Sequence, residues 1–415
     1  MPRGTVTAPP SKSYTHRAMV LGMLTHESFT LRNPLLSEDT KATMDAIFAL
    51  GSEVRIDSNS VRIRCDELRA PPGVIDARNS GTTIRLVAGI ASLLPARTTL
   101  TGDQSLVRRP MKPLVDALVQ LGAKCAYLGQ LGYPPLAVEG AIAGSRAEIP
   151  GGVSSQFVSS LLIACTQKRG PTEIVVKGEL RSRPYVDITL EMLREFGGAV
   201  EESASGFLVP GQQTLSKESY TVPGDYSSAA FPLAAATVTG GDVTVRGLAK
   251  DSPQGDRAIV QYLRMFGAEV DVRADSVRVR GGALRGAEID VRHTPDLFPV
   301  LAVVGAVAKG RTVLRGGETL KEKESDRIST TVAFLKAMGA KVEPRQDGCE
   351  IEGGTRLRGA TVETQGDHRI LMAAAVAALA ASSESVIADE SSYAVSYPGF
   401  IRDMHQLGCR MEVRR

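Results

Sequence analysis

Two cations and two serine hydroxyl groups are gathered in one short stretch near the start of the chain, residues 10–17. Lys12 and Arg17 flank Ser13, and an apolar run follows at once over residues 18–24. This pattern predicts the first turn of a buried helix, whose free N–H groups and positive dipole end bind anions. Taken alone, the stretch is equally typical of a capped helix with two surface cations.

Five more polar openings of this kind precede apolar helical stretches, at roughly the same spacing along the chain. They are Asn79-Ser80-Gly81, Ser154-Ser155-Gln156, Asp225-Tyr226-Ser227, Thr294-Pro295-Asp296 and Gly366-Asp367-His368. Near these openings lie seven cations: Lys12, Arg17, Arg85, Arg109, Lys323, Arg327 and Arg369. Because the net charge is only +3, such a cluster predicts a local site for a small, strongly anionic ligand.

Two acidic residues stand among these cations. Asp296 opens one of the apolar helices, and Glu324 lies inside the charged run of residues 321–327. Such a run is usually a solvated helix face. Held among cations, however, the two carboxylates are suited to move a proton. We find no P-loop motif, dinucleotide-binding glycine motif or cluster of metal ligands, so neither a cofactor nor a metal is expected.

The elements that position these residues repeat six times. A Leu/Phe/Met-Gly phrase recurs about every 70 residues after an amphipathic helical pattern, and each glycine is a natural helix C-cap. The six glycines are Gly51, Gly122, Gly197, Gly267, Gly339 and Gly408. After each comes an alternating segment typical of a β-hairpin, such as residues 268–280. Helices that are apolar on every face must be buried.

The repeat predicts a mixed α/β (α+β) fold of two domains, each with three βαβαββ units around a pseudo-threefold axis. We expect residues 11–223 to form the N-terminal domain. Residues 1–10, whose strand needs a partner, are expected to join residues 224–415 in the C-terminal domain. Helix starts facing one cleft would then gather the cations at one ligand site.

The composition excludes several classes of function. Tryptophan is absent and aromatic residues make up 5%, so stacking on nucleic-acid bases is not expected. No apolar stretch is long enough to span a membrane, and the five scattered cysteines are typical of a reducing compartment. We therefore expect a cytoplasmic protein that acts on small molecules.

Several phrases, in this order and spacing, resemble 5-enolpyruvylshikimate-3-phosphate synthase over essentially the whole chain. They include Pro10-Ser11-Lys12-Ser13, Asn79-Ser80-Gly81-Thr82, Arg108-Arg109-Pro110, Val153-Ser154-Ser155-Gln156, Ser182-Arg183-Pro184-Tyr185, Lys323-Glu324-Ser325-Asp326-Arg327 and Gly366-Asp367-His368-Arg369. The resemblance implies two inverse α/β-barrel-like domains that close on substrate. It implies transfer of an enolpyruvyl group from phosphoenolpyruvate to the 5-hydroxyl of shikimate 3-phosphate, in aromatic amino-acid biosynthesis, by a monomer that glyphosate targets.

The resemblance also implies roles for individual residues. Those for shikimate 3-phosphate, mainly on the N-terminal domain, are Lys12, Ser13, Arg17, Ser154, Ser155, Gln156, Ser182, Tyr185, Asp296 and Lys323. Those for phosphoenolpyruvate are Lys12, Asn79, Gly81, Arg109, Gln156, Arg327 and Arg369. The catalytic set is Asp296, Glu324, Lys12 and His368, with the first two as the acid/base pair. The C-terminal domain would supply the acid/base side and the phosphoenolpyruvate side.

Two positions depart from the family pattern: Val395 replaces the usual lysine before Ser-Tyr-Pro, and Thr319 replaces an asparagine. Three alternatives remain. A UDP-N-acetylglucosamine enolpyruvyl transferase would need a cysteine in residues 104–109, where there is none. Val395 favours a non-catalytic anion-binding protein. Low aromatic content and the small net charge disfavour an RNA-end-processing enzyme.

Overall fold

The computed structural model describes residues 1–413 and separates into two compact units. The central unit is Ser11–Val222, and the terminal unit combines residues 1–10 with the chain from Pro223 onward. The chain passes from the terminal unit to the central unit after Pro10 and returns to the terminal unit at Pro223, so a proline lies at each of these two crossings. Within the terminal unit the two crossing segments are joined, because Asp225 N–H donates to the Pro9 carbonyl at 2.8 Å.

The central unit contains three four-stranded sheets. Each sheet holds one parallel pair of strands, extended by an antiparallel hairpin. The first is β13 (Ser219–Thr221), β2 (Phe29–Arg32), β4 (Ser60–Arg64) and β3 (Glu53–Asp57). The second is β5 (Val74–Asp76), β6 (Thr98–Thr101), β8 (Leu136–Glu139) and β7 (Lys124–Tyr127). The third is β11 (Glu201–Ser203), β12 (Gly206–Val209), β10 (Thr172–Lys177) and β9 (Arg146–Pro150).

Two kinds of helix fill and cover this unit. The buried helices are α1 (Lys12–Met23), α3 (Gly81–Ala91) and α5 (Ser155–Gln167), and α3 packs against both of the others. The amphipathic helices are α2 (Glu38–Ala49), α4 (Lys112–Gln120) and α6 (Arg183–Glu195), and a short 3₁₀ turn, η1, spans Leu106–Arg108. The apolar helices lie inside because their surface has no polar face to offer to water.

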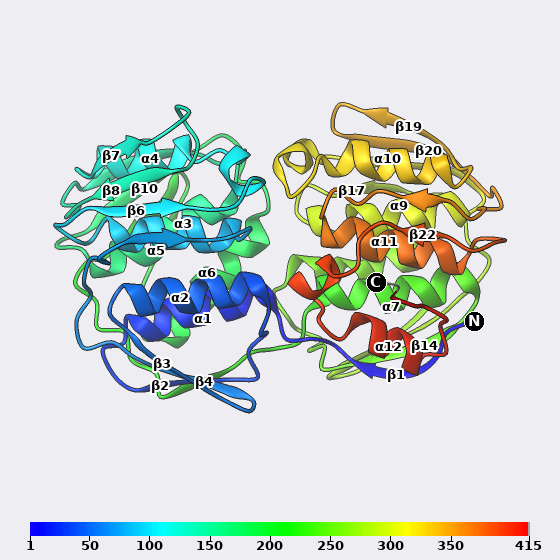
Figure 1. Cartoon of the computed structure of the whole chain (residues 1–415), viewed down its shortest axis with the longest axis horizontal. Coiled ribbons are helices and arrows are strands. Elements are labelled where there is room, and N and C mark those ends of the chain that lie inside the picture. The colour runs from blue at the N-terminus through cyan, green and yellow to red at the C-terminus, as the bar shows by residue number, and fades with distance from the viewer. Residues whose placement is uncertain (414–415) are drawn as a thin grey trace. The chain divides into compact units, whose positions relative to one another are not determined.

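The terminal unit repeats this plan. Its two four-stranded sheets are β1 (Arg3–Thr7), β14 (Asp242–Arg246), β16 (Ser276–Arg280), β15 (Glu269–Val272), and β17 (Glu288–Asp290), β18 (Gly310–Arg315), β20 (Gly348–Gly353), β19 (Lys341–Arg345). The buried helices are α7 (Tyr226–Thr239), α9 (Phe298–Val307) and α11 (His368–Leu379), which pack against one another (Figure 1). The outer helices are α8 (Ile259–Met265), α10 (Arg327–Ala337) and α12 (Phe400–Gln406). Four 3₁₀ turns are η2 (Gly255–Ala258), η3 (Pro295–Leu297), η4 (Glu318–Glu322) and η5 (Ser392–Val395).

The sixth repeat differs from the other five. Its sheet has only two strands, β21 (Thr361–Val362) and β22 (Val386–Ile387). Residues 409–413, which follow Gly408, form no strand, so the hairpin expected there is absent from the described residues. The prediction of a hairpin in every repeat is therefore wrong for this one.

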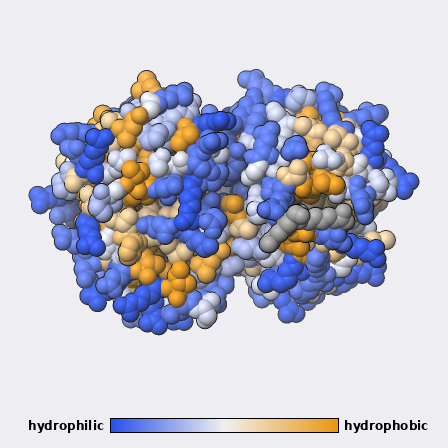
Figure 2. All heavy atoms as spheres, viewed as in Figure 1, coloured by the Kyte–Doolittle hydropathy of each residue, from blue (hydrophilic) through white to orange (hydrophobic). Residues whose placement is uncertain are grey.

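The six repeated glycines adopt the backbone conformation that the C-cap prediction requires. All have positive φ, between 80° and 110°: Gly51, Gly122, Gly197, Gly267, Gly339 and Gly408. A side chain is disfavoured in this left-handed region, and glycine is not. On the face shown in Figure 2, hydrophilic residues predominate and hydrophobic ones are scattered. No helix among residues 1–413 is long and apolar enough to cross a membrane.

Candidate active site

Helix α1 starts at Lys12, as the sequence predicts. Its N-cap, Ser11, has extended backbone and makes no capping hydrogen bond with its side chain. The Lys12 ammonium forms an ion pair with Asp39 in the first turn of α2, with Nζ 2.9 Å from Oδ2. The sequence predictions missed Asp39, although its place after the N-cap Ser37 could have indicated an acidic residue at a helix start.

Arg17 lies one turn deeper in α1 and is fully buried. Its guanidinium donates to neutral oxygens: Thr189 Oγ1 at 2.7 Å, Ser159 Oγ at 3.3 Å, and the carbonyls of Tyr185 and Ser13 at 3.0 and 2.9 Å. Burial lowers the pKa of Arg17 to about 10, so the group keeps its charge near neutral pH. A buried cation balanced only by neutral acceptors is a strong binding group for an anion.

The start of α3 brings two more arginines beside Gly81. A methyl group at Gly81 would lie 3.3 Å from Arg109 Nη1 and 3.5 Å from Arg85 Nη1. Arg109 donates to Asn79 Oδ1 at 2.6 Å, and Arg85 donates to Gln156 Oε1 at 2.6 Å. The predicted residues Asn79, Gly81, Arg109 and Gln156 therefore lie together. Arg85, which was not assigned to a substrate, links Gln156 to α3 by its hydrogen bond.

The hydroxyl residues of the prediction lie at other helix starts of the central unit. Ser154 caps α5 by accepting from Gln156 N–H at 3.3 Å, and Ser155 is the first residue of that helix. Ser182 precedes α6 with φ 53°, a left-handed conformation that costs a serine of order 1 kcal/mol. Tyr185 follows in the first turn of α6, where its carbonyl accepts from Arg17. Backbone strain of this kind is frequent at functional sites.

In the terminal unit, Arg327 is surrounded by three carboxylates. Its Nη1 donates to Asp296 Oδ1 at 2.7 Å, its Nη2 to Glu324 Oε2 at 2.7 Å, and its Nε to Asp367 Oδ2 at 2.8 Å. The guanidinium is 1% exposed and Asp367 is 0% exposed, whereas Asp296 and Glu324 are 23% and 16% exposed. Burial alone would lower the pKa of Arg327, but Asp367, Glu324 and Asp296 raise it well above its ordinary value.

Asp296 also contacts a second cation. Arg369 Nη2 donates to Asp296 Oδ2 at 3.2 Å and to Ser227 Oγ at 2.7 Å. Burial would raise the pKa of Asp296, but Arg369, Arg327 and Lys323 outweigh it and hold the pKa well below its ordinary value. Asp296 is therefore ionised at neutral pH.

The starts of α7 and α11 each hold a buried aspartate. Asp367 caps α11 by accepting from Arg369 N–H at 2.9 Å, and Asp225 caps α7 by accepting from Ser227 N–H at 3.2 Å. Burial raises the pKa of Asp225, which Arg369 partly opposes. His368 is buried behind Asp367, with Nδ1 3.9 Å from Asp367 Oδ1. The functional prediction omitted Asp367 and Asp225, although both stand where a helix N-cap is expected.

The departures from the family pattern lie in η4 and η5. Thr319 is in η4, and Val395 ends η5 next to Ser396, whose carbonyl accepts from Ser228 in α7 at 3.2 Å. Arg402, the arginine that follows this segment, pairs with Asp403 at 2.9 Å, and its side chain is 79% exposed.

Known proteins resemble this chain over its full length. The family model "EPSP synthase (3-phosphoshikimate 1-carboxyvinyltransferase)" matches residues 2–404. The chain belongs to the EPSP synthase family. The 3-phosphoshikimate 1-carboxyvinyltransferase of Methanocella arvoryzae is 47% identical, over 99% of this chain and 97% of that protein. The one from Methanocorpusculum labreanum is 46% identical, over 98% and 97%.

Solved structures of EPSP synthase agree with this assignment. The enzyme from Acinetobacter baumannii is 29% identical and superposes with a TM-score of 0.83, covering 100% of this chain and 97% of that one. The predictions of the family, the fold class and the reaction are confirmed. The chain is a transferase of the shikimate pathway for aromatic amino acids. Of the three alternatives, none is favoured by these matches.

Proposed function

We propose that the chain transfers the carboxyvinyl group of phosphoenolpyruvate to the 5-hydroxyl of shikimate 3-phosphate and releases phosphate. The observation that carries the residue assignment is the buried cluster around Arg327, which places Asp296 and Glu324 on one guanidinium. Two carboxylates in different surroundings suit a reaction that must both remove and deliver a proton.

Shikimate 3-phosphate would bind mainly to the central unit. Its cationic and neutral donors would come from three helices: Arg17 and Ser13 on α1, Ser154, Ser155 and Gln156 at α5, and Ser182 and Tyr185 at α6. The phosphate suits the free N–H groups at the start of α5, and the carboxylate suits Arg17, whose acceptors are all neutral. Lys323 and Asp296 would complete this set from the terminal unit.

Phosphoenolpyruvate would take cations from both units. Lys12, Asn79, Gly81, Arg109 and Gln156 belong to the central unit, and Arg327 and Arg369 to the terminal unit. Gly81 would leave space beside the Arg109 guanidinium, which a methyl group at this position would crowd.

The proposed proton transfers depend on Asp296 and Glu324, which both accept hydrogen bonds from Arg327. In the addition step, the 5-hydroxyl oxygen bonds to C2 of phosphoenolpyruvate, the hydroxyl proton leaves to a carboxylate, and C3 gains a proton. In the elimination step, C3 loses a proton and the C2–O bond to phosphate breaks. An anion that draws Arg327 away from Glu324 would raise the pKa of Glu324, so that this carboxyl could carry the C3 proton. Asp296, held ionised by two arginines, suits the hydroxyl proton. Lys12 and His368 would assist.

Release of inorganic phosphate tests this proposal. The purified protein with shikimate 3-phosphate and phosphoenolpyruvate should release phosphate, and no release at saturating substrate would contradict it. Glu324→Gln should lower kcat about 100-fold or more while the Kd of shikimate 3-phosphate changes little, because one proton-transfer group is lost. Glu322→Gln, two residues away in η4, is the matched control and should keep wild-type kcat. Equal losses of kcat and affinity in Glu324→Gln would leave Glu324 only a binding role.

We further propose that the enzyme acts in the cytoplasm as a monomer and without a cofactor. The assay above, run after dialysis against a chelator, should give an unchanged rate. Sedimentation at assay concentration should give the mass of one chain. Glyphosate, an anionic compound, should compete with phosphoenolpyruvate for the cations beside Gly81.

A further inference from the structure

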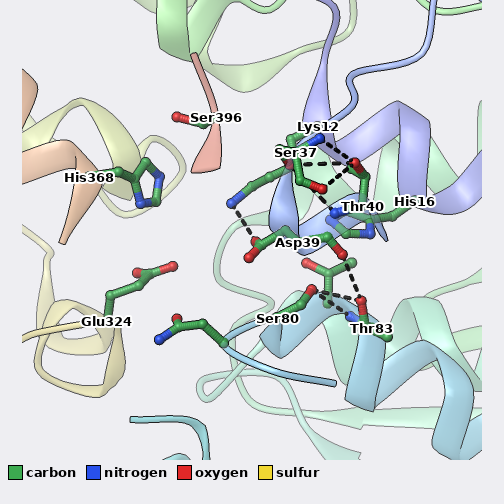
Figure 3. A network of polar contacts seen from close by, with 12 residues as sticks. Lys12, His16, Ser37, Asp39, Thr40, Ser80, Thr83, Glu324, His368 and Ser396 are labelled. Atoms are coloured by element: carbon green, nitrogen blue, oxygen red, sulfur yellow. Dashed lines mark hydrogen bonds and ion pairs between the residues drawn. The ribbon is translucent and has the colours of Figure 1, made fainter. Parts of the chain in front are cut away.

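A buried hydrogen-bond chain in the central unit joins the second turns of α1 and α2 to the start of α3. It consists of His16 on α1, Thr43 on α2, and Thr83 and Ser80 at α3. His16, Thr83 and Ser80 are labelled in Figure 3. His16 Nδ1 is 2.7 Å from Thr43 Oγ1, Thr43 Oγ1 is 2.7 Å from Thr83 Oγ1, and Thr83 Oγ1 donates to Ser80 Oγ at 2.7 Å. All four side chains are at most 1% exposed. None of them belongs to the substrate or catalytic sets proposed above.

The chain has one consistent proton direction. Thr83 has one hydroxyl proton, which it donates to Ser80 Oγ or to the Asp39 carbonyl at 3.3 Å. Thr43 must therefore donate to Thr83, and His16 must donate to Thr43 through a protonated Nδ1. Nε2 of His16 has no hydrogen-bond partner among the described residues. Burial, together with Lys12 and Arg17, holds the pKa of His16 well below its ordinary value, in accord with a neutral ring.

Helices α1 and α2 are thus connected twice, one helical turn apart. The outer connection is the Lys12–Asp39 ion pair, and the inner one is the His16–Thr43 hydrogen bond. The inner connection continues through side-chain hydroxyls to α3, where Ser80 precedes and Thr83 follows Gly81 within one turn. From the outer connection, the backbone carbonyl of Asp39 also accepts from Thr83. An anion that binds Lys12 competes with Asp39, so the outer connection weakens when substrate arrives, whereas the inner one is beyond its reach.

We propose that His16 is a positioning residue for Lys12 and for the start of α3. It keeps both in register when the Lys12–Asp39 pair opens to take phosphoenolpyruvate. The inference rests on the proposed assignment of Lys12 and Gly81 to that substrate. Arg17, the next residue, is held independently by Thr189, Ser159 and Tyr185, so shikimate 3-phosphate should be less affected.

The test compares His16→Leu, His16→Asn and Thr43→Val with the wild-type chain in the phosphate-release assay. His16→Leu removes the donor at similar volume, and we expect the KM of phosphoenolpyruvate to rise about tenfold, the effect of one buried hydrogen bond. The KM of shikimate 3-phosphate should change less than about threefold. His16→Asn can still donate to Thr43 and should restore most of the affinity. The double variant His16→Leu/Thr43→Val should be no worse than the worse single variant, because both break one chain.

A control separates positioning from loss of stability. Val209→Ala, in the core of β12, should lower stability without changing the ratio of the two KM values. The inference is overturned if His16→Leu leaves the KM of phosphoenolpyruvate within about twofold of wild type, or raises both KM values equally. It is also overturned if His16→Asn is as impaired as His16→Leu. The wild-type rate, measured alongside, tests the proposed function separately.

Discussion

Replacing Arg327 by methionine should make the stability of the terminal unit strongly dependent on pH. The substitution keeps an unbranched apolar stem and removes a guanidinium that is 1% exposed and bound by three carboxylates. Asp367, 0% exposed, would then be a buried charge without its nearest cation. Removing one partner from a buried ion pair typically costs about 3–5 kcal/mol, and we expect a loss of this size near neutral pH.

The direction of the pH effect follows from the carboxylates. In the wild-type chain the pKa of Asp296 is well below its ordinary value, so its contribution to stability is present above the unfolded pKa and is lost only in strong acid. In Arg327→Met the three carboxylates lose the cation that they share and keep their burial and mutual repulsion, so their pKa values should rise. The rise should be smallest for Asp296, which Arg369 still contacts. The variant is then least destabilised near pH 4.5, where the carboxylates can protonate, and most destabilised above about pH 7.

Urea unfolding followed by far-UV circular dichroism measures this effect, since the chain has no tryptophan to report by fluorescence. Arg278→Met is the matched control in the same unit. Arg278 also binds a carboxylate with two hydrogen bonds, to Asp242 at 2.8 and 2.6 Å, but both side chains are about one-third exposed. Its loss should cost at most about 1 kcal/mol. If Arg327→Met costs no more than the control, or equally much at acid and neutral pH, the carboxylate cluster is not held by Arg327 as we describe.

Three more substitutions test the site. Gly81→Ala should raise the KM of phosphoenolpyruvate about tenfold or more and leave that of shikimate 3-phosphate nearly unchanged in steady-state assays, because the new methyl group would lie 3.3 Å from Arg109 Nη1. Val395→Lys should lower the KM of phosphoenolpyruvate by adding a cation, and an unchanged KM would show that η5 does not face this substrate. Ser182→Ala and Ser182→Gly should both raise the KM of shikimate 3-phosphate. In urea unfolding the alanine variant should be about 1 kcal/mol less stable than the glycine variant, since only glycine relieves the left-handed backbone at φ 53°.

The sequence was sufficient to predict the elements that depend on local pattern. Helix α9 is apolar on every face from Phe298 to Val307, so burial was its only stable place. The positive φ of Gly51 and its five counterparts followed from their position after an amphipathic helix. Helix starts at Ser154 and Asp367 followed from capping residues before apolar runs.

Contacts between distant segments could not be predicted in this way. The first sheet is completed by β13, which pairs in parallel with β2 across most of the central unit's length. A local pattern does not say which strand takes an open edge. The partners of Lys12 and Arg327, Asp39 and Asp367, were missed for the same reason. An acidic residue at a helix start gives no sign of which cation will pack against it.

The two most deeply buried arginines of the site differ in their partners, and this difference separates their roles. Arg327 is neutralised by three carboxylates, so an incoming anion must displace one of them before it gains the full charge. Asp296 and Glu324 are both more exposed than Asp367, and Asp296 is held by Arg369 as well, so we expect Glu324 to be the carboxylate that an anion displaces. Within residues 1–413, Arg17 donates only to neutral oxygens, so an anion would meet its whole charge without displacing a carboxylate. On the proposed assignment, binding at Arg17 would leave the protonation of its neighbours unchanged. Binding at Arg327 would change the pKa of a carboxylate, which is what a proton-transfer step requires.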